Sequence, residues 1–158
     1  MIYVRLYRFS PIQDEEQLFK AVNYIAKGST KLCKKIIGKP LPTSSLTIFS
    51  HYSKEYEQLT NILLGLGTKL KEQNGIYVTL DEPISVGKHL IKQIRIRQPD
   101  PYRMQVGCND FEVKDYHSFK KEYLNKFPQN LRLIERSDYE MIEFCDPAFD
   151  VLAYVVSK

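Results

Sequence analysis

The segment 93–97, Gln-Ile-Arg-Ile-Arg, places two arginines where they could bind an anion. Apolar and polar residues alternate along it, as they do in a β-strand with one buried face. Arg95 and Arg97 therefore share the other face, and guanidinium groups bind carboxylate or phosphate through paired hydrogen bonds. Two interpretations stay open. The arginines line a ligand-binding cavity, or they face water and pair with glutamates of a neighbouring strand.

The segment 99–108, Pro-Asp-Pro-Tyr-Arg-Met-Gln-Val-Gly-Cys, is the second candidate for ligand contacts. Its prolines restrict the backbone, and loops held on a rigid scaffold often carry function. The expected ligand contacts in this segment are Tyr102, Arg103 and Gln105. The alternative is a structured crossover whose arginine pairs with Asp100 or Asp110.

Carboxylates and histidines elsewhere could support acid–base or metal chemistry. In a strand over residues 110–113, Asp110 and Glu112 share one face, and two carboxylates in a closed pocket can transfer protons when their pKa values differ. If His51 converges with Asp110 and Glu143, the three could hold a divalent metal. The alternative places the histidines on the surface or at a helix entry.

The charge distribution is uneven along the chain. The net charge is +4, yet residues 1–40 contain eight basic and three acidic residues and so account for +5. The lysines of this region without an intervening acid are Lys27, Lys31, Lys34, Lys35 and Lys39. A basic helix can contact phosphate groups or an anionic lipid surface. We favour a solvated helix face and do not expect nucleic-acid binding.

Composition and missing motifs exclude several classes of protein. Hydrophobic residues make up 43% and charged residues 27% of the chain, which is typical of a globular domain. The sequence has no Gly-x-Gly-x-x-Gly, Walker or Gly-x-Ser-x-Gly motif. Three cysteines without a Cys-x-x-Cys pair indicate reduced thiols and a cytoplasmic location. No signal peptide or membrane-spanning segment is predicted.

The elements that must position these residues begin with a strand over residues 2–9. A helix follows over residues 14–26, starting at an acidic first turn. Gly28 is expected to interrupt it, and the helical pattern then resumes until Gly38. This region is predicted to be a helical arm ahead of the main body.

The rest of the chain shows the same order of elements twice. The first copy has a strand over 46–50, a helix capped by Ser53 and ended by Gly67, and a hairpin at Asn74-Gly75 before a strand over 89–97. The second copy has a strand over 110–113, a helix capped by Asp115 and ended by Pro128, and three strands. These strands cover residues 131–135, 139–144 and 151–155. The recurrence predicts a tandem structural repeat.

Two consecutive βαβββ modules resemble the glyoxalase/bleomycin-resistance fold, also called the vicinal oxygen chelate superfamily. Residues 140–147, Glu-Met-Ile-Glu-Phe-Cys-Asp-Pro, are similar to its closing strand–Asp-Pro–strand. The first module resembles the YecM-like branch, with a helical segment before the first strand, a strand like residues 76–84 and a Leu/Ile-rich strand like residues 89–97. The resemblance covers roughly residues 14–156.

The resemblance implies metal ligands at fixed strand positions, which fall here on Ser45, Cys108 and Ala153. A catalytic metal usually needs three protein ligands and an open position. We therefore expect the usual metal site to be missing and predict no cofactor, while a divalent metal at a displaced site remains possible.

The sequence thus predicts an α+β fold in which two tandem modules form a curved mixed sheet around a cavity. The expected boundaries are 1–43 for the N-terminal strand and helical arm, 44–98 and 108–158 for the modules, and 99–107 for the linker. The predicted function is binding of a small polar or anionic molecule by a YecM-like protein, which could form a homodimer. The alternatives are a metal-dependent lyase or isomerase, and an interaction module that uses the basic arm.

Overall fold

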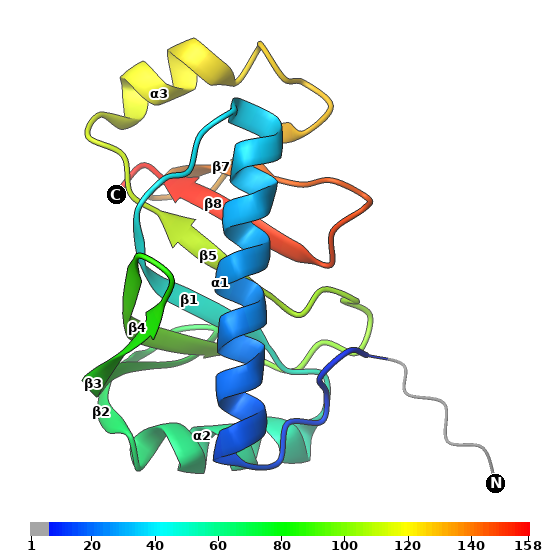
Figure 1. The fold of residues 1–158 in the computed structure, drawn as a ribbon, viewed down its shortest axis with the longest axis vertical. Helices are drawn as coiled ribbons and strands as arrows, with labels where there is room; N and C mark the ends of the chain where they lie inside the picture. The colour runs from blue at the N-terminus through cyan, green and yellow to red at the C-terminus, as the bar shows by residue number, and fades with distance from the viewer. Residues whose placement is uncertain (1–6) are drawn as a thin grey trace, which may run out of the picture.

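A computed structural model describes residues 7–158 as an α+β fold of three helices and eight strands, which confirms the predicted fold class (Figure 1). In chain order the elements are α1 Glu15–Ile37, β1 Thr43–Phe49, α2 Ser53–Leu64, β2 Gly67–Glu72, β3 Gly75–Val86, β4 His89–Arg97, β5 Gly107–Phe111, α3 Tyr116–Tyr123, β6 Leu131–Glu135, β7 Glu140–Phe144 and β8 Val151–Val156. None of these helices is long and apolar enough to cross a membrane.

All eight strands belong to one mixed sheet with the order β2-β3-β4-β1-β5-β8-β7-β6. β1 is parallel to β4, and β5 is parallel to β8. The antiparallel pair of β1 and β5 joins the two halves of the sheet. In each half, therefore, the last strand returns beside the first strand.

Helix α1 is continuous, so the predicted interruption at Gly28 is wrong. The helix begins at Asp14, whose carboxylate accepts a hydrogen bond from the Gln17 amide at 2.8 Å, and ends at Gly38 with φ of 82°. Gly28 instead allows close packing on β8, because a Cβ atom there would lie 3.0 Å from Val151. The strand predicted over residues 2–9 lies mostly outside the described residues, and residues 7–9 form a bend.

Helix α1 is also not an arm ahead of the main body, because its apolar stripe packs along one face of the sheet (Figure 1). Its first half shares a core with α2, β1, β3 and β4, where Leu18 and Val22 are fully buried. Its second half shares a core with α3, β7 and β8, where Leu32 and Cys33 are fully buried. A 23-residue helix of this amphipathic kind spans both halves of the sheet.

The other face of the sheet, here named the open face, is lined by the alternate residues of the same strands. Its apolar centre is a small buried cluster of Phe49, Cys108, Leu152 and Tyr154. Arg95 and Arg97 of β4 lie on this face too, because Ile94 and Ile96 point into the core on the opposite side. The open face is therefore the part of the sheet that the helices leave uncovered.

Two of the three turn and cap predictions based on local sequence are confirmed. The Asn74-Gly75 hairpin is confirmed, with φ of 49° and 114° at the two turn residues, and Asp115 caps α3 by accepting from the Ser118 amide at 3.1 Å. The predicted Ser53 cap is wrong, because Tyr52 is the N-cap and provides no side-chain hydrogen bond.

Three predicted boundaries are also wrong. Helix α2 ends at Leu64, before Gly67, and α3 ends at Tyr123, before Pro128. Strand β5 ends at Phe111, so Glu112 lies beyond the strand, where it accepts a hydrogen bond from Ser44. Asp110 and Glu112 are consequently not a carboxylate pair on one strand face.

Candidate functional site

Three arginines gather at the open face. Burial lowers the pKa of Arg97, and the neighbouring charges of Arg103 and Arg95 lower it further. The Arg97 guanidinium lies 4.8 Å from the centre of the Phe49 ring. All three arginines are half-buried, so each has lost part of its hydration.

No carboxylate in residues 7–158 forms an ion pair with these arginines; the arginines that do form ion pairs in this part of the chain are Arg8 and Arg132. The cross-strand pairs with glutamate that sequence left open for Arg95 and Arg97 are therefore not formed. Arg103 likewise does not pair with Asp100 or Asp110. The positive charge of the arginine cluster is therefore not neutralised by an ion pair within residues 7–158.

Arg95 has a fixed orientation at the edge of this cluster. Its guanidinium donates to the carbonyl oxygen of Asn74 from Nη2 at 2.7 Å and from Nε at 3.2 Å. It also lies 5.2 Å from the centre of the Tyr77 ring. The hairpin that sequence predicted at Asn74-Gly75 thus positions one of the candidate ligand contacts.

Asp110 of β5 brings a carboxylate to the same face. Burial raises its pKa to about 6, and the charge of Arg95 opposes that shift. Within the described part of the chain its side chain forms no ion pair, and the hydrogen bond from Thr43 goes to its backbone carbonyl. The neighbouring Cys108 is only 4% exposed, and burial together with the Asp110 charge raises the pKa of its thiol, which stays neutral.

Glu143 of β7, in contrast, is fully satisfied. It is 4% exposed and accepts hydrogen bonds from the Tyr154 hydroxyl at 2.7 Å and from Arg132 at 3.0 Å. Burial raises the pKa of Tyr154, and the hydrogen bond to Glu143 raises it further, so the phenol remains protonated. This group stiffens the pairing of β6, β7 and β8 beside the arginine cluster.

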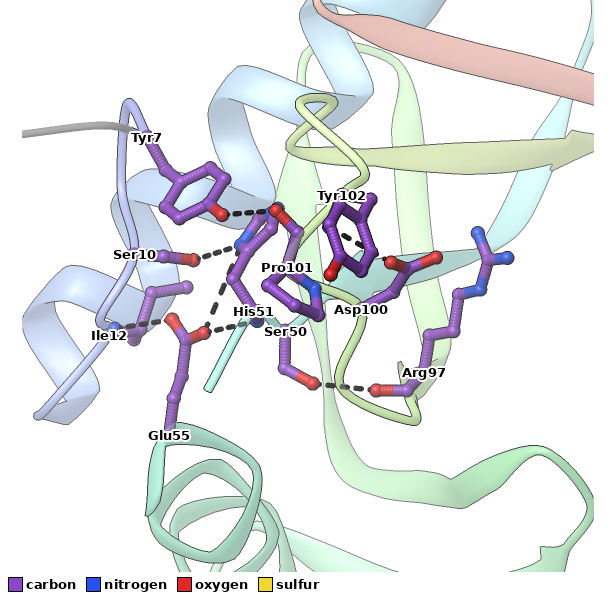
Figure 2. A network of polar contacts seen from close by, with 10 residues as sticks. All are labelled: Tyr7, Ser10, Ile12, Ser50, His51, Glu55, Arg97, Asp100, Pro101 and Tyr102. Carbon is purple, nitrogen blue, oxygen red and sulfur yellow. Dashed lines mark hydrogen bonds and ion pairs between the residues drawn. The ribbon is translucent and has the colours of Figure 1, made fainter. Parts of the chain in front are cut away.

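A second polar network surrounds His51, which lies between Ser10 and Glu55 (Figure 2). The Nδ1 atom of His51 is 2.6 Å from Ser10 Oγ, and its ring stacks on Tyr7 at 3.8 Å between centres. The Glu55 carboxylate accepts from the backbone amides of His51 at 2.8 Å and Ile12 at 2.7 Å. His51 is 3% exposed, and burial lowers its pKa although Glu55 opposes the shift.

This His51 network also fastens the segment that carries Arg103 (Figure 2). The Tyr7 hydroxyl donates to the Pro101 carbonyl at 2.5 Å, and the Asp100 amide donates to the Ser50 carbonyl at 3.1 Å. Asp100 then accepts from the amides of Tyr102 and Arg103. The turn after β4 is therefore held against the start of α2, which places Arg103 beside Arg97.

The structure brings together only part of the predicted ligand-binding set. Arg95, Arg97 and Arg103 are neighbours, as the electrostatic contacts of Arg97 show. Tyr102 is 92% exposed, and its role as a ligand contact stays a prediction. Gln105 is half-buried on the same segment, and its backbone faces His51.

The predicted displaced metal site is not assembled. His51 contacts Ser10 through Nδ1, Glu143 accepts from Tyr154, and Asp110 lies across β1 from Arg95, so the three are not brought together. In residues 7–158 no group of three or more His, Cys, Asp or Glu side chains could hold a metal ion.

The superfamily's own metal positions do not fit a metal either. Of the three aligned residues, Ala153 has no donor atom and is fully buried in the core under α1. Cys108 is a buried neutral thiol, whereas metal ligands are thiolates. Ser45 alone is left, which is too few donors for a divalent cation.

The basic segment forms a solvated face of α1 beside the loop before β8. A groove of about 470 Å³ lies here, and its lining includes Arg8, Tyr24, Lys27, Lys31, Phe149 and Asp150. Arg8 pairs with Asp150 at 2.7 Å, and Lys35 pairs with Asp146 at 2.9 Å. Of the five lysines of the basic segment, Lys35 alone forms an ion pair within residues 7–158, and all five are exposed.

Sequence reasoning missed how Asp110, Cys108 and the arginines share one surface. The signal was present in the alternation of β5, which puts Cys108 and Asp110 on the same face. What the sequence did not give was the register of β5 against β1 and of β1 against β4, which sets their distance from Arg95.

No protein-family model and no curated protein matches the chain. A solved structure described as the structural genomics protein EC4020 is similar, with a TM-score of 0.66 and 13% sequence identity. The match covers 98% of this chain and 93% of that chain. At this identity the likeness concerns the fold alone.

Proposed function

We propose that this chain binds a small anionic molecule on its open face through Arg95, Arg97 and Arg103. The observation that carries the proposal is the absence of any ion pair to these three half-buried arginines in residues 7–158, where the ion-paired arginines are Arg8 and Arg132. Partly dehydrated cations that repel one another are costly unless an anion compensates them.

The chemistry of the cluster suits a carboxylate or a phosphate. A guanidinium group presents several N–H donors in one plane, and two such groups can hold one oxyanion by paired hydrogen bonds. The aromatic rings of Phe49 and Tyr77 lie against two of the guanidiniums and limit their motion. A ligand would therefore meet arginines that are already oriented.

We also propose that the chain is a glyoxalase-fold protein of the YecM-like branch that lacks the usual metal site. The two halves have the same order of one strand, one helix and three strands, and the same parallel pairing of first and last strand, which supports the tandem modules. The donor set at Ser45, Cys108 and Ala153 argues against ordinary metal-dependent chemistry of that superfamily.

The test is a titration of the protein with inorganic phosphate and with citrate, followed by the ¹H–¹⁵N NMR spectrum, for wild type and Arg97→Ala. The variant is expected to lose about tenfold or more in affinity, because a charge-assisted hydrogen bond contributes about 1.5–3 kcal/mol. Arg136→Ala is the matched control, since Arg136 is exposed near the far edge of the sheet. Equal affinity in wild type and Arg97→Ala would contradict the proposal.

Metal content separates this proposal from the metal-dependent alternative. Elemental mass spectrometry of tag-free protein, purified without a chelator, measures it directly. Near-stoichiometric zinc, nickel, manganese or iron would overturn the metal-free proposal and make His51, Asp110 and Glu143 the first substitution targets.

A further inference from the structure

Arg95 and Asp110 lie on the same face of the sheet but on opposite sides of β1. Arg95 is opposite Thr47, and Asp110 is opposite Ser45, two residues earlier along β1. Two strand spacings across the sheet and two residues along it together correspond to roughly 12 Å between their backbones. The cation and the carboxylate are thus separated by a short stretch of sheet surface.

The two groups do not close this separation by pairing with each other. The Arg95 guanidinium is held by the Asn74 carbonyl and by the ring of Tyr77, on the side away from Asp110. The Asp110 carboxylate has no hydrogen-bond donor or ion-pair partner within the described chain, although the charge of Arg95 acts on it. A half-buried carboxylate and a half-buried arginine that face one surface without meeting leave both for a third molecule.

Ser45 and Thr47 of β1 lie between them on this face, and Cys108 lies beside Thr47 on β5. Its thiol is within electrostatic range of Asp110, Arg95 and Arg97, and it is neutral and 4% exposed. The side chains of Ser45, Thr47 and Cys108 carry no charge, so they do not compete with an anion for the arginines. The surface therefore offers cationic donors on one side and a lone acceptor on the other.

We propose that the open face selects acids that carry a hydrogen-bond donor next to the acid group, as hydroxy acids and amino acids do. The arginines hold the acid group, and the Asp110 carboxylate accepts from the hydroxyl or ammonium group. This proposal rests on the proposed function of the arginine cluster and adds the ligand class. The raised pKa of Asp110 is consistent with a carboxylate that lacks a donor until the ligand arrives.

Succinate, malate and aspartate form a matched series to test this, since they share one four-carbon dicarboxylate skeleton. They differ by a hydrogen, a hydroxyl or an ammonium group at one carbon. Titrations at pH 7.5 are followed by ¹H–¹⁵N NMR, and the wild-type comparison needs no substitution. Malate or aspartate is expected to bind about tenfold more tightly than succinate, the size of one hydrogen bond to a charged group.

The variants Asp110→Asn and Asp110→Ser show whether this preference comes from Asp110, and a thermal unfolding curve shows whether each is folded. Both are expected to lose the preference while succinate affinity is kept or improved. Arg97→Ala is expected to weaken all three acids alike. A preference for malate identifies the donor as a hydroxyl, and a preference for aspartate identifies it as an ammonium group.

The two proposals fail in different ways. If succinate binds as tightly as malate and aspartate, and Arg97→Ala weakens all three, then the selection by Asp110 is wrong and anion binding stands. A preference that persists in both Asp110 variants also overturns the selection. If wild type and Arg97→Ala have the same affinity for each of the three acids, both proposals are wrong.

Discussion

The His51 network and the open-face arginine cluster differ in whether their buried carboxylate has hydrogen-bond partners. In the first, the Glu55 carboxylate accepts from two backbone amides and the His51 ring has Ser10 and Tyr7 as partners (Figure 2). In the second, Asp110 has no partner of this kind in residues 7–158. His51 comes two residues after the end of β1, and Arg97 is the last residue of β4, so the two regions lie near one another in the fold. Position in the fold therefore does not explain the difference.

The difference indicates two roles. A carboxylate with two amide donors from separate segments ties those segments together, and here it joins the residues before α1 to the start of α2. Buried charges without partners join no segments, and burying them lowers the free energy of unfolding. The first region therefore holds chain segments together, and the second has the unpaired charges on which our proposal of a ligand site rests.

Removing the Glu55 carboxylate should produce the largest effect on stability. Glu55→Ala leaves the amides of Ile12 and His51 buried without an acceptor, and each orphaned group costs about 1–3 kcal/mol. We expect the free energy of unfolding to fall by about 3–4 kcal/mol in urea titrations.

The control for this prediction is Glu57→Ala, on the exposed side of the same helix, which should change stability by less than about 0.5 kcal/mol. A loss at Glu55 no larger than at Glu57 would show that the amides find other acceptors and that the network does not fasten the N-terminal segment.

Asp110 should behave in the opposite sense, so that its substitution stabilises the protein. Its pKa is raised from 3.8 to about 6 in the fold, so folding is favoured at low pH and this advantage is lost as pH rises through 6. Because the side chain is half-buried, we expect Asp110→Asn to gain about 2 kcal/mol over wild type above pH 7 and almost nothing at pH 4.

Urea titrations from pH 4 to pH 8 measure this pH dependence. Glu112→Gln is the control, since Glu112 is exposed and has a hydroxyl partner in Ser44. If the stability difference between Asp110→Asn and wild type does not change with pH, Asp110 is not desolvated. Its position on the same face as the arginines would then no longer indicate a ligand site.

How far the sequence anticipated each region follows from the kind of signal it contains. Local patterns carried the hairpin at Asn74-Gly75, the cap at Asp115 and the strand 89–97, because each depends on neighbours within a few residues. The shared face of Arg95 and Arg97 follows from simple alternation. These parts of the candidate site were therefore predictable.

The contacts between residues far apart in the sequence were not predictable. Gly28 looked like a helix break, because the sequence does not show that β8 passes within contact of that position. His51 and Glu55 are one helical turn apart, yet their partners Ser10 and Ile12 are about 40 residues away along the chain. Register and chain crossing decide such contacts, and a single sequence does not specify them.

The His51 network provides a pH dependence of opposite sign to that of Asp110. Burial lowers the pKa of His51 below its ordinary value of 6.5, so the unfolded chain binds the proton more readily than the fold does. This contribution to stability is complete above pH 6.5 and is lost as pH falls below it. His51→Gln should therefore show a weaker loss of stability than wild type between pH 7 and pH 5.

The exposed His117 provides the matched substitution, His117→Gln, as the control for the loss of an imidazole ring. Parallel profiles for His51→Gln and wild type would show that His51 is not held neutral by burial, and the contrast between the two regions would narrow to Asp110 alone.

The smallest effect is expected from easing the repulsion within the arginine cluster. Arg103 lies beside Arg97 and opposes its charge, so Arg103→Gln should raise the free energy of unfolding by about 0.3–0.5 kcal/mol at low ionic strength. The gain should shrink in 0.5 M NaCl, since salt screens the repulsion, and 10 mM phosphate should stabilise wild type more than the variant. If Arg103→Gln instead destabilises the protein at low salt, Arg103 acts as a structural contact, and the idea that its charge is reserved for a ligand is wrong.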